Sequence, residues 1–428
     1  VFNLLKMDGA TAGEGGQAGP NYDDSDSEDE VFIDPSDPAL QGRVACELDG
    51  QDDDEGDDDM EEEEDDEEAG AHNVEDEEPV VDVSKGRIEG HTGEIYCVAL
   101  HPSNANLIAT GSGDDTGGLW DRATKQRIAT LDGHTDTVVQ VAFNVSGSLV
   151  ATAGMDGIVK VWNSNDGSPV ASLEGPGEDI TFINWHSKGD VLLAGSSDAS
   201  VWMWNATSGA CMAVLSGHSD SVTCGMFSQD GKSVLTASAD GSARVWNPKD
   251  SSCMVSLSDP KGLGTFHSGP ITCLDTKGDF LLTGSEDATA ILTALVMSSG
   301  GAPTGKVVAI YKHHTLGVEA VAISPSLQYM ATAGIDAQIY VYNAHQETPR
   351  FQCSHQAAVT KIMWHPTQEV LLSCSVDKSV GVWDGRSGAQ IAKWTGHTDT
   401  VMDVAVSSDG RSAVSASDDA CLLLWTFD

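Results

Sequence analysis

Histidine, a hydroxyl residue and aspartate recur together along the chain, and these residue types form hydrolytic catalytic triads. One set consists of His91, Thr110 and Asp114. A hydrolase needs one active site, whereas at least five segments of this chain carry a similar set. Repetition therefore favours a structural role, in which the polar groups pair with one another inside each repeat. The clearest sets, each with the tryptophan that follows, are His91, Thr110, Asp114 and Trp120; His134, Thr152, Asp156 and Trp162; His218, Thr236, Asp240 and Trp246; and His397, Ser415, Asp419 and Trp425.

Other chemistry finds little support in the residue pattern. The 13 histidines occur mainly once per repeat, not in the close clusters of a zinc site. His313-His314 is the one adjacent pair, and one of the two is expected to serve its own repeat. Glycine-rich pieces such as Gly111-Ser-Gly113 fall in expected turns with no helix after them, unlike phosphate-binding loops. We predict no enzyme activity, no metal and no cofactor.

The elements that must position these residues follow from an internal repeat. An aromatic residue, usually tryptophan, recurs about every 42 residues, and an aspartate lies six residues before it. A Gly-His pair opens several of these units. A worn copy between residues 246 and 342 has His267 and Asp287, but Thr293 stands in the tryptophan position. The chain thus has eight units. Their aromatic residues are Trp120, Trp162, Trp204, Trp246, Tyr342, Trp383 and Trp425.

This pattern resembles the WD-repeat family, in which Gly-His opens and Trp-Asp or Trp-Asn closes each unit. The resemblance implies an all-β fold, an eight-bladed β-propeller over residues 80–428. In the first unit we expect strands at Ile95–Leu100, Leu107–Gly111 and Gly118–Trp120, which alternate with turn residues. The last unit ends at its third strand, so residues 80–88 are expected to supply the fourth strand and close the ring. A closed ring lacks free edges, which favours a monomer.

The N-terminal arm, residues 1–79, is expected to be disordered. Residues 1–85 hold 32 acidic and three basic residues, and residues 51–68 are almost unbroken Asp and Glu. Such a run has no apolar face to bury and repels itself. It acts either as a solubilising tail or as an electrostatic lure for a basic client. Ser25 and Ser27 have acids three residues downstream, a weak signal for an acidophilic kinase.

Composition limits the partners and the compartment. A net charge of −45 disfavours nucleic acid and anionic membranes and suits a basic protein or peptide. The chain has no run of 18 apolar residues, so we expect no transmembrane helix. Its nine cysteines form no Cys-x-x-Cys pair, which indicates reduced thiols in the cytoplasm or the nucleus. Val1 and Met7 both remain candidates for the true N terminus.

A ligand of a non-enzymatic propeller is expected on exposed loops. In WD-repeat proteins, residues three and five after the loop histidine, and the residue before the turn aspartate, face the central opening. A face with several acids, a tyrosine and no base at these positions suits Arg and Lys side chains. The predicted client-binding residues are Glu94, Tyr96, Asp179, Glu286, Glu319, Asp418 and, one step beyond, Asp403.

One segment narrows the family. Residues 179–186, residues 191–195 and the aromatic pair around Trp204 resemble the third repeat of the angio-associated migratory cell protein family, which includes a yeast chaperone dedicated to one large-subunit ribosomal protein. The fifth repeat without its tryptophan and Ser354-His355-Gln356 add to the likeness. The resemblance implies a cytosolic chaperone that holds a basic ribosomal protein, with Glu94, Glu319 and Asp418 as client contacts.

Alternative functions remain open at this point. The animal members of that family imply a signalling or cell-migration scaffold. Trp383-Asp-Gly-Arg386 resembles the box by which some WD-repeat proteins dock on cullin-type ubiquitin ligases, which would make the chain a substrate receptor. An acidic arm with a propeller is also similar to histone-binding WD proteins.

Overall fold

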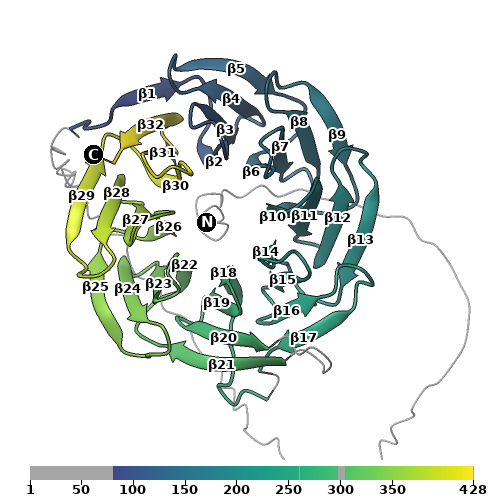
Figure 1. Cartoon of the computed structure of the whole chain (residues 1–428), viewed down its shortest axis with the longest axis vertical. Coiled ribbons are helices and arrows are strands. Elements are labelled where there is room, and N and C mark those ends of the chain that lie inside the picture. The colour runs from purple at the N-terminus through teal and green to yellow at the C-terminus, as the bar shows by residue number, and fades with distance from the viewer. Residues whose placement is uncertain (1–80, 260, 297–303, 428) are drawn as a thin grey trace, which may run out of the picture. The chain divides into compact units, whose positions relative to one another are not determined.

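The computed structural model describes residues 81–259, 261–296 and 304–427. Every regular element in these ranges is a β-strand, and the strands form eight four-stranded antiparallel sheets arranged as blades around a centre (Figure 1). The expected all-β propeller of eight blades is confirmed. The predicted arm, with Ser25 and Ser27, lies outside the described residues. Within the described ranges, no helix is long and apolar enough to cross a membrane.

Each blade follows the chain from the centre of the ring to its rim. We number the blades 1 to 8 in chain order. Blades 1 to 4 contain the strands β2 (Ile95–Leu100), β3 (Leu107–Ser112), β4 (Gly117–Asp121), β5 (Gln126–Leu131); β6 (Val138–Phe143), β7 (Leu149–Gly154), β8 (Val159–Asn163), β9 (Pro169–Leu173); β10 (Ile180–Trp185), β11 (Val191–Ser196), β12 (Ser200–Asn205), β13 (Cys211–Ser216); β14 (Cys224–Phe227), β15 (Val234–Ala237), β16 (Ala243–Trp246) and β17 (Cys253–Leu257).

The second half of the ring repeats this order. Blades 5 to 7 contain β18 (Ile271–Lys277), β19 (Phe280–Ser285), β20 (Ala290–Val296), β21 (Thr304–Tyr311); β22 (Val318–Ile323), β23 (Tyr329–Gly334), β24 (Gln338–Asn343), β25 (Pro349–Ser354); β26 (Val359–Trp364), β27 (Val370–Ser375), β28 (Ser379–Asp384) and β29 (Gln390–Thr395). Blade 8 contains β30 (Val401–Val406), β31 (Ser412–Ser417), β32 (Cys421–Thr426) and, from the start of the described chain, β1 (Gly86–Glu89).

The burial of the strands follows their place in the blade. In blade 1 all six residues of β3 are buried, because neighbouring blades cover both of its faces. The outer strand β5 instead alternates exposed and covered residues, as expected for a strand with one face to solvent. The predicted strand Ile95–Leu100 matches β2, while β3 and β4 are each slightly longer than expected.

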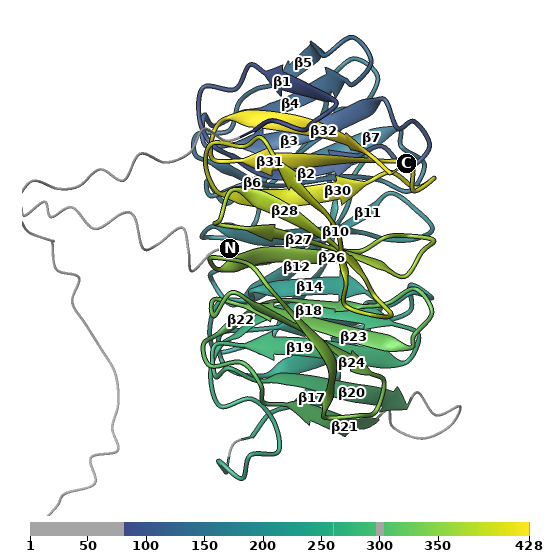
Figure 2. The same cartoon turned by 90° about the vertical axis from the view of Figure 1, so that its left-hand side faces the viewer.

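The ring closes through β1, which pairs antiparallel with β32 from Gly86 opposite Leu424 to Glu89 opposite Cys421 (Figure 2). This strand begins later than the expected 80–88. The residues just before it bond to blade 7 instead, where Val83 N donates to Thr395 O at 3.0 Å and Thr395 Oγ1 donates to Val81 O at 2.7 Å. The first described residues therefore hold blades 7 and 8 together.

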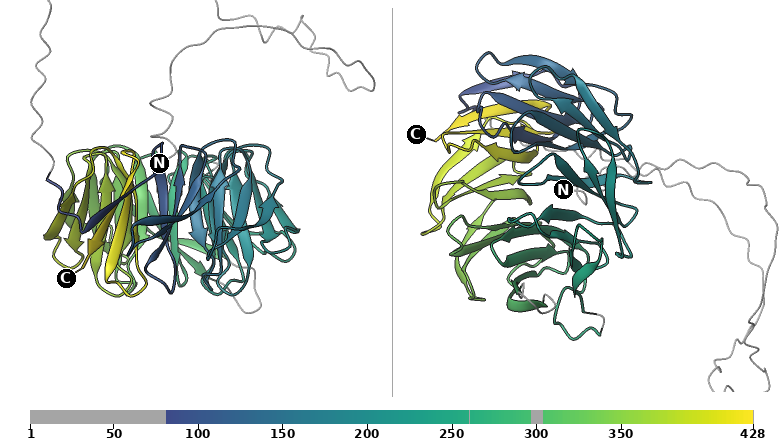
Figure 3. Two further views of the ribbon diagram at one scale, coloured as in Figure 1. Left: turned by 90° about the horizontal axis from the view of Figure 1, so that it is seen from above. Right: turned by 45° about the vertical axis from the view of Figure 1, so that its right-hand side comes forward.

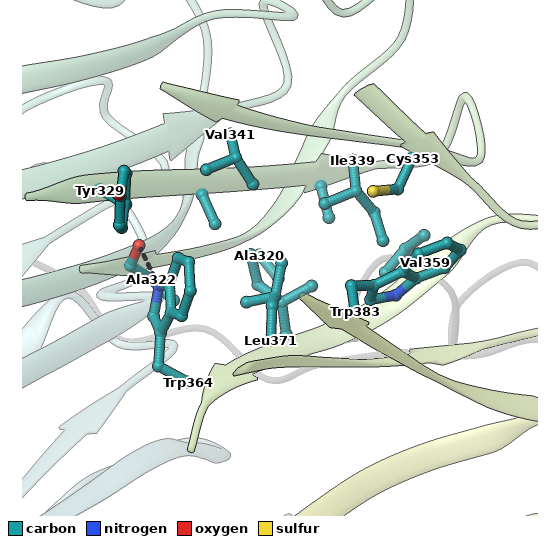
Figure 4. Packing of buried hydrophobic residues seen from close by; sticks show 13 residues of the cluster. Ala320, Ala322, Tyr329, Ile339, Val341, Cys353, Val359, Trp364, Leu371 and Trp383 are labelled. Carbon is teal, nitrogen blue, oxygen red and sulfur yellow. Dashed lines mark hydrogen bonds between the residues drawn. The ribbon is translucent and has the colours of Figure 1, made fainter. Parts of the chain in front are cut away.

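Side chains from neighbouring blades share each core cluster. Between blades 6 and 7, Val341 of β24, Leu371 of β27 and Trp383 of β28 belong to one core cluster (Figure 4). At one end of the cluster the indole of Trp364 donates to Ala322 O at 3.2 Å (Figure 4). Because a single blade cannot cover both of its apolar faces, burial between blades stabilises the closed ring.

Hydrogen bonds from inner-strand side chains also join neighbouring blades. Asn184, the fifth residue of β10, accepts from Phe227 N of blade 4 at 3.1 Å. Asp275, the fifth residue of β18, accepts from Ile323 N of blade 6 at 2.7 Å. At this strand position, a side-chain amide in blade 3 and a side-chain carboxyl in blade 5 each accept a hydrogen bond from the backbone of the next blade.

Candidate ligand-binding face

The recurring polar residues form a buried hydrogen-bond chain within a blade. In blade 1, Trp120 Nε1 donates to Thr110 Oγ1 at 2.8 Å, Thr110 Oγ1 lies 2.7 Å from His91 Nε2, and His91 Nδ1 lies 2.9 Å from Asp114 Oδ2. Blades 2, 4, 7 and 8 repeat this chain with distances of 2.7–3.1 Å. Because the polar groups of each chain pair with one another, these hydrogen bonds stabilise the blade.

The charge states follow from the same contacts. Burial lowers the pKa of His91, and the hydrogen bond and charge of Asp114 only partly offset this effect. Burial alone would raise the pKa of Asp114, but hydrogen bonds from Thr116, Thr92 and His91 lower it to about 2. At neutral pH the imidazole is therefore neutral, with Nδ1–H donated to the carboxylate and Nε2 accepting from the threonine hydroxyl.

Three blades depart from this arrangement. In blade 6 His314, and not His313, bonds to Asp336 and Thr332 at 3.0 and 2.9 Å. In blade 5 His267 bonds to Thr283 at 2.8 Å. Thr293 occupies the tryptophan position there, and its buried hydroxyl has no hydrogen-bond partner among the described residues. In blade 3 Gly175-Pro176 replaces Gly-His, and Asp198 accepts from Gly177 N at 2.8 Å.

One face of the ring is built by a backbone contact that recurs in all eight blades. We call this side, on which the inner strands begin, the top face (Figure 3). In each blade the donor is the backbone N–H of the residue just before the turn aspartate. The acceptor is the backbone carbonyl of the residue three positions after the loop histidine, or of the equivalent residue in blade 3. The N–O distances are 2.9–3.0 Å. The eight donor and acceptor pairs are Gly113 and Glu94, Met155 and Thr137, Ser197 and Asp179, Ala239 and Ser221, Glu286 and Pro270, Ile335 and Gly317, Val376 and Ala358, and Asp418 and Thr400.

Four of the predicted client-binding acids belong to these pairs. Glu94 and Glu286 are exposed, and Asp179 and Asp418 are partly exposed. They come from blades 1, 5, 3 and 8 respectively. These four predicted acids therefore lie on the top face, although they come from blades spread around the ring.

Blades 1 and 8 bring three predicted residues together. The carboxylates of Glu94 and Asp418 both act on the half-buried phenol of Tyr96, whose pKa is raised to about 12 by burial first and then by these two charges. Gly113 lets the side chains of Glu94 and Tyr96 pack close to its backbone, because an ideal Cβ there would lie 2.9 Å from Glu94 Oε2 and 3.3 Å from the Tyr96 ring. We call Glu94, Tyr96 and Asp418 the acidic cluster. A cation placed there would meet two carboxylates and an aromatic ring.

Two other predicted residues are buried. Glu319, on β22, and Asp403, on β30, are each 5% exposed, so neither presents an open carboxylate on a loop as expected. Asp403 pairs with Lys361 of β26 at 2.6 Å and accepts from Val98 N at 3.0 Å. Lys361 has the same strand position in blade 7 as Asp403 has in blade 8. This basic residue was not considered in the prediction from sequence.

Two further expectations concern other sites. In the Trp383–Arg386 box, Trp383 is buried in its hydrogen-bond chain, and Asp384 Oδ1 accepts from Arg386 N at 2.7 Å. The Arg386 side chain is exposed at the turn between β28 and β29. Among the described residues, no group of three His, Cys, Asp or Glu side chains could hold a metal ion.

Comparison with known proteins agrees with this architecture. The chain is 31% identical to the angio-associated migratory cell protein of Canis lupus familiaris over 170 residues, which is 36% of this chain and 38% of that protein. The Homo sapiens protein is 30% identical with the same shares. The match therefore spans about two-fifths of these relatives.

Solved structures share the fold over more of their length. Sqt1 from Saccharomyces cerevisiae superposes with a TM-score of 0.71 at 20% identity, covering 80% of this chain and 98% of Sqt1. Chaetomium thermophilum Sqt1 bound to the N-terminus of the ribosomal protein L10 gives 0.73 at 22% identity, covering 81% and 100%.

A family model matches the whole ring. The model of the WD domain, G-beta repeat, matches eight segments, residues 83–121, 125–163, 167–205, 209–247, 261–292, 305–343, 347–384 and 388–426. Seven of these segments run from the outer strand of one blade to the third strand of the next, whereas the segment 261–292 begins after the outer strand β17. The chain belongs to the WD-repeat family.

Proposed function

We propose that the chain is a non-enzymatic binding protein that holds a basic segment of a client protein on its top face. The observation that carries this proposal is the acidic cluster, in which the carboxylates of Glu94 and Asp418 both act on Tyr96. Two carboxylates beside an aromatic ring suit a guanidinium or ammonium group. A net charge of −45 adds long-range attraction for a basic partner.

The client that fits best is a large-subunit ribosomal protein, held by a dedicated chaperone before assembly. Ribosomal proteins are basic, so free copies need a partner of opposite charge. The shared fold with an Sqt1 that was solved with the N-terminus of the ribosomal protein L10 supports this choice. On this proposal the chain acts as a monomer in the cytoplasm, with the nucleus as a second location, and does not contact nucleic acid directly.

The test removes two charges and leaves the fold intact. Wild type and a Glu94→Gln/Asp418→Asn variant are used to capture partners from native lysate and to titrate a labelled N-terminal peptide of ribosomal protein L10. A matched control, Asp279→Asn/Glu347→Gln, removes two exposed acids from turns at the opposite ends of the strands. Glu319 and Asp403 are left unchanged because they are buried.

We expect the cluster variant to bind the peptide about tenfold more weakly at 50 mM salt, and the control to bind as wild type. The difference should shrink at 500 mM salt because screening weakens exposed charge pairs. Equal binding by all three proteins contradicts the proposal. Capture of cullin-ligase components by all three would favour the Trp383–Arg386 box instead.

A further inference from the structure

The top face changes character at blades 6 and 7. Each blade offers three loop residues here, namely the two members of its backbone-bonded pair and the residue before the acceptor. In six blades at least one of the three is acidic, including Asp136 in blade 2 and Asp220 in blade 4. The two remaining blades offer Leu316, Gly317 and Ile335, and Ala357, Ala358 and Val376. We call these six residues the apolar sector.

Five of the six residues of the apolar sector are at least partly accessible, and Gly317 is buried. Leu316 is 52% exposed, and Ile335, Ala357, Ala358 and Val376 are partly exposed. Blades 6 and 7 are neighbours in the ring, so the residues come from adjacent loops (Figure 1). Single apolar side chains on a surface are common, whereas a group from adjacent loops is typical of a binding surface. Met155 of blade 2 shows the contrast, since Asp136 and Thr137 accompany it there.

The apolar sector is continuous with the acidic part of the top face. On one side, an ideal Cβ at Gly317 would lie 3.5 Å from Ile335 Cδ1 and 3.4 Å from the Cα of Glu286 in blade 5. On the other side, blade 8 follows blade 7 and carries Asp418 of the acidic cluster. Lys378 lies in the same turn as Val376. A ligand that spans the face therefore meets carboxylates, then a neutral apolar surface, then carboxylates.

We infer that the apolar sector binds large aliphatic or aromatic side chains of the same segment whose basic residues occupy the acidic cluster. This inference rests on the proposed function and specifies the client as a segment that is both basic and apolar. The opposite assignment is disfavoured because none of the six residues of the apolar sector offers a carboxylate to Arg or Lys. Removal of apolar side chains from water then adds affinity that charge pairing cannot supply.

The two contributions differ in their response to salt. Screening weakens the carboxylate contacts as ionic strength rises, but it leaves apolar contacts almost unchanged. The test titrates the labelled N-terminal peptide of ribosomal protein L10 with the full chain at 50 and 500 mM salt. It compares wild type, Leu316→Ser/Val376→Ser, and Glu94→Gln/Asp418→Asn. The matched control is Val145→Ser/Ile391→Ser, which changes two residues that are each 57% exposed in an opposite-side turn and on the outer strand of blade 7.

We expect Leu316→Ser/Val376→Ser to weaken binding about fivefold at both salt concentrations, while the control binds as wild type. If this variant binds as wild type and the acidic-cluster variant is weakened, the inference is wrong and the proposed function stands. If the apolar variant alone is weakened, the sector is a binding surface but the basic-client proposal fails. If neither is weakened, both proposals fail. Thermal unfolding of each variant confirms that the ring is intact.

Discussion

Lys361 Nζ lies 2.6 Å from Asp403 Oδ1, across the boundary between blades 7 and 8. The second carboxylate oxygen of Asp403 accepts from Val98 N of blade 1 at 3.0 Å. Burial disfavours the charge on Lys361, but the Asp403 carboxylate more than compensates and raises the lysine pKa. One ion pair thus connects three consecutive blades beside the place where the chain closes its ring.

Removal of the lysine should weaken this connection. Lys361→Met leaves the carboxylate of Asp403, whose side chain is 7% exposed, without its counter-charge. We expect the free energy of unfolding to fall by about 2 kcal/mol, less than for a fully buried pair because the Lys361 side chain reaches solvent. Urea denaturation followed by tryptophan fluorescence measures the change. Lys361→Met/Asp403→Asn should recover most of the lost unfolding free energy, since an amide oxygen can still accept from Val98 N. An unchanged denaturation midpoint for Lys361→Met would show that the ion pair does not stabilise the closed ring.

Asp275 should make the stability of the ring depend on pH. Burial raises its pKa to about 6, although its hydrogen bond from Ile323 N opposes the shift. A raised carboxyl pKa means that the stability it contributes is complete below about pH 4 and is lost as the pH rises through 6. Asp275→Asn keeps the acceptor, as Asn184 does at the same strand position, and removes the buried charge.

We therefore expect Asp275→Asn to exceed wild type in unfolding free energy by on the order of 1 kcal/mol at pH 8. The two proteins should become equal near pH 4. Denaturation at pH 4, 6 and 8 provides the comparison. A constant difference across this range would mean that Asp275 does not titrate there.

The hydrogen-bond chains should be sensitive to loss of their central hydroxyl. Thr152 Oγ1 accepts from Trp162 Nε1 at 2.9 Å and lies 2.8 Å from His134 Nε2. Thr152→Val preserves the shape but leaves two buried polar groups without partners, so we expect a loss of about 2–3 kcal/mol of unfolding free energy. Thr124→Val, at an exposed turn, is the control and should unfold as wild type. Similar midpoints for both variants would argue against a stabilising chain.

The fold could be predicted because the sequence repeats with a regular spacing of about 42 residues. Tryptophans 42 residues apart mark the third strand of blades 1 to 4, and in blades 1, 2 and 4 a hydroxyl ten residues earlier faces the same way, so the hydrogen-bond chain follows from the repeat. The closing strand follows the same spacing, since β1 ends at Glu89 and the outer strand β5 ends 42 residues later at Leu131. The expected bounds 80–88 began too early because Val81 and Val83 bond to blade 7, and β1 pairs with β32 from Gly86 to Glu89.

The ligand face was harder to predict because the inner strands contain a β-bulge. In blade 1 the bulge lies between Ile95 and Cys97, which leaves Tyr96 outside the regular pairing. Asp403 lies one residue further along its own strand and is paired with Ala416, so its side chain takes the other side. Counting from the loop histidine selects the position of Tyr96, and Asp403 entered the prediction only as one step beyond it. Lys361 has the register of Asp403 and was missed because that next position was not counted.

A methyl group at Gly113 should test whether a client enters the acidic cluster. An ideal Cβ at Gly113 would lie 2.9 Å from Glu94 Oε2, the end of a flexible side chain, so Gly113→Ala should displace that carboxylate without unfolding the blade. We expect about fivefold weaker binding of the labelled ribosomal peptide, equivalent to about 1 kcal/mol. Gly189→Ala is the matched control, since no atom lies within 4 Å of the Cβ it would add. If Gly113→Ala binds as tightly as Gly189→Ala while Glu94→Gln/Asp418→Asn is weakened, the client depends on the charges of the cluster and not on where the Glu94 carboxylate lies beside Tyr96.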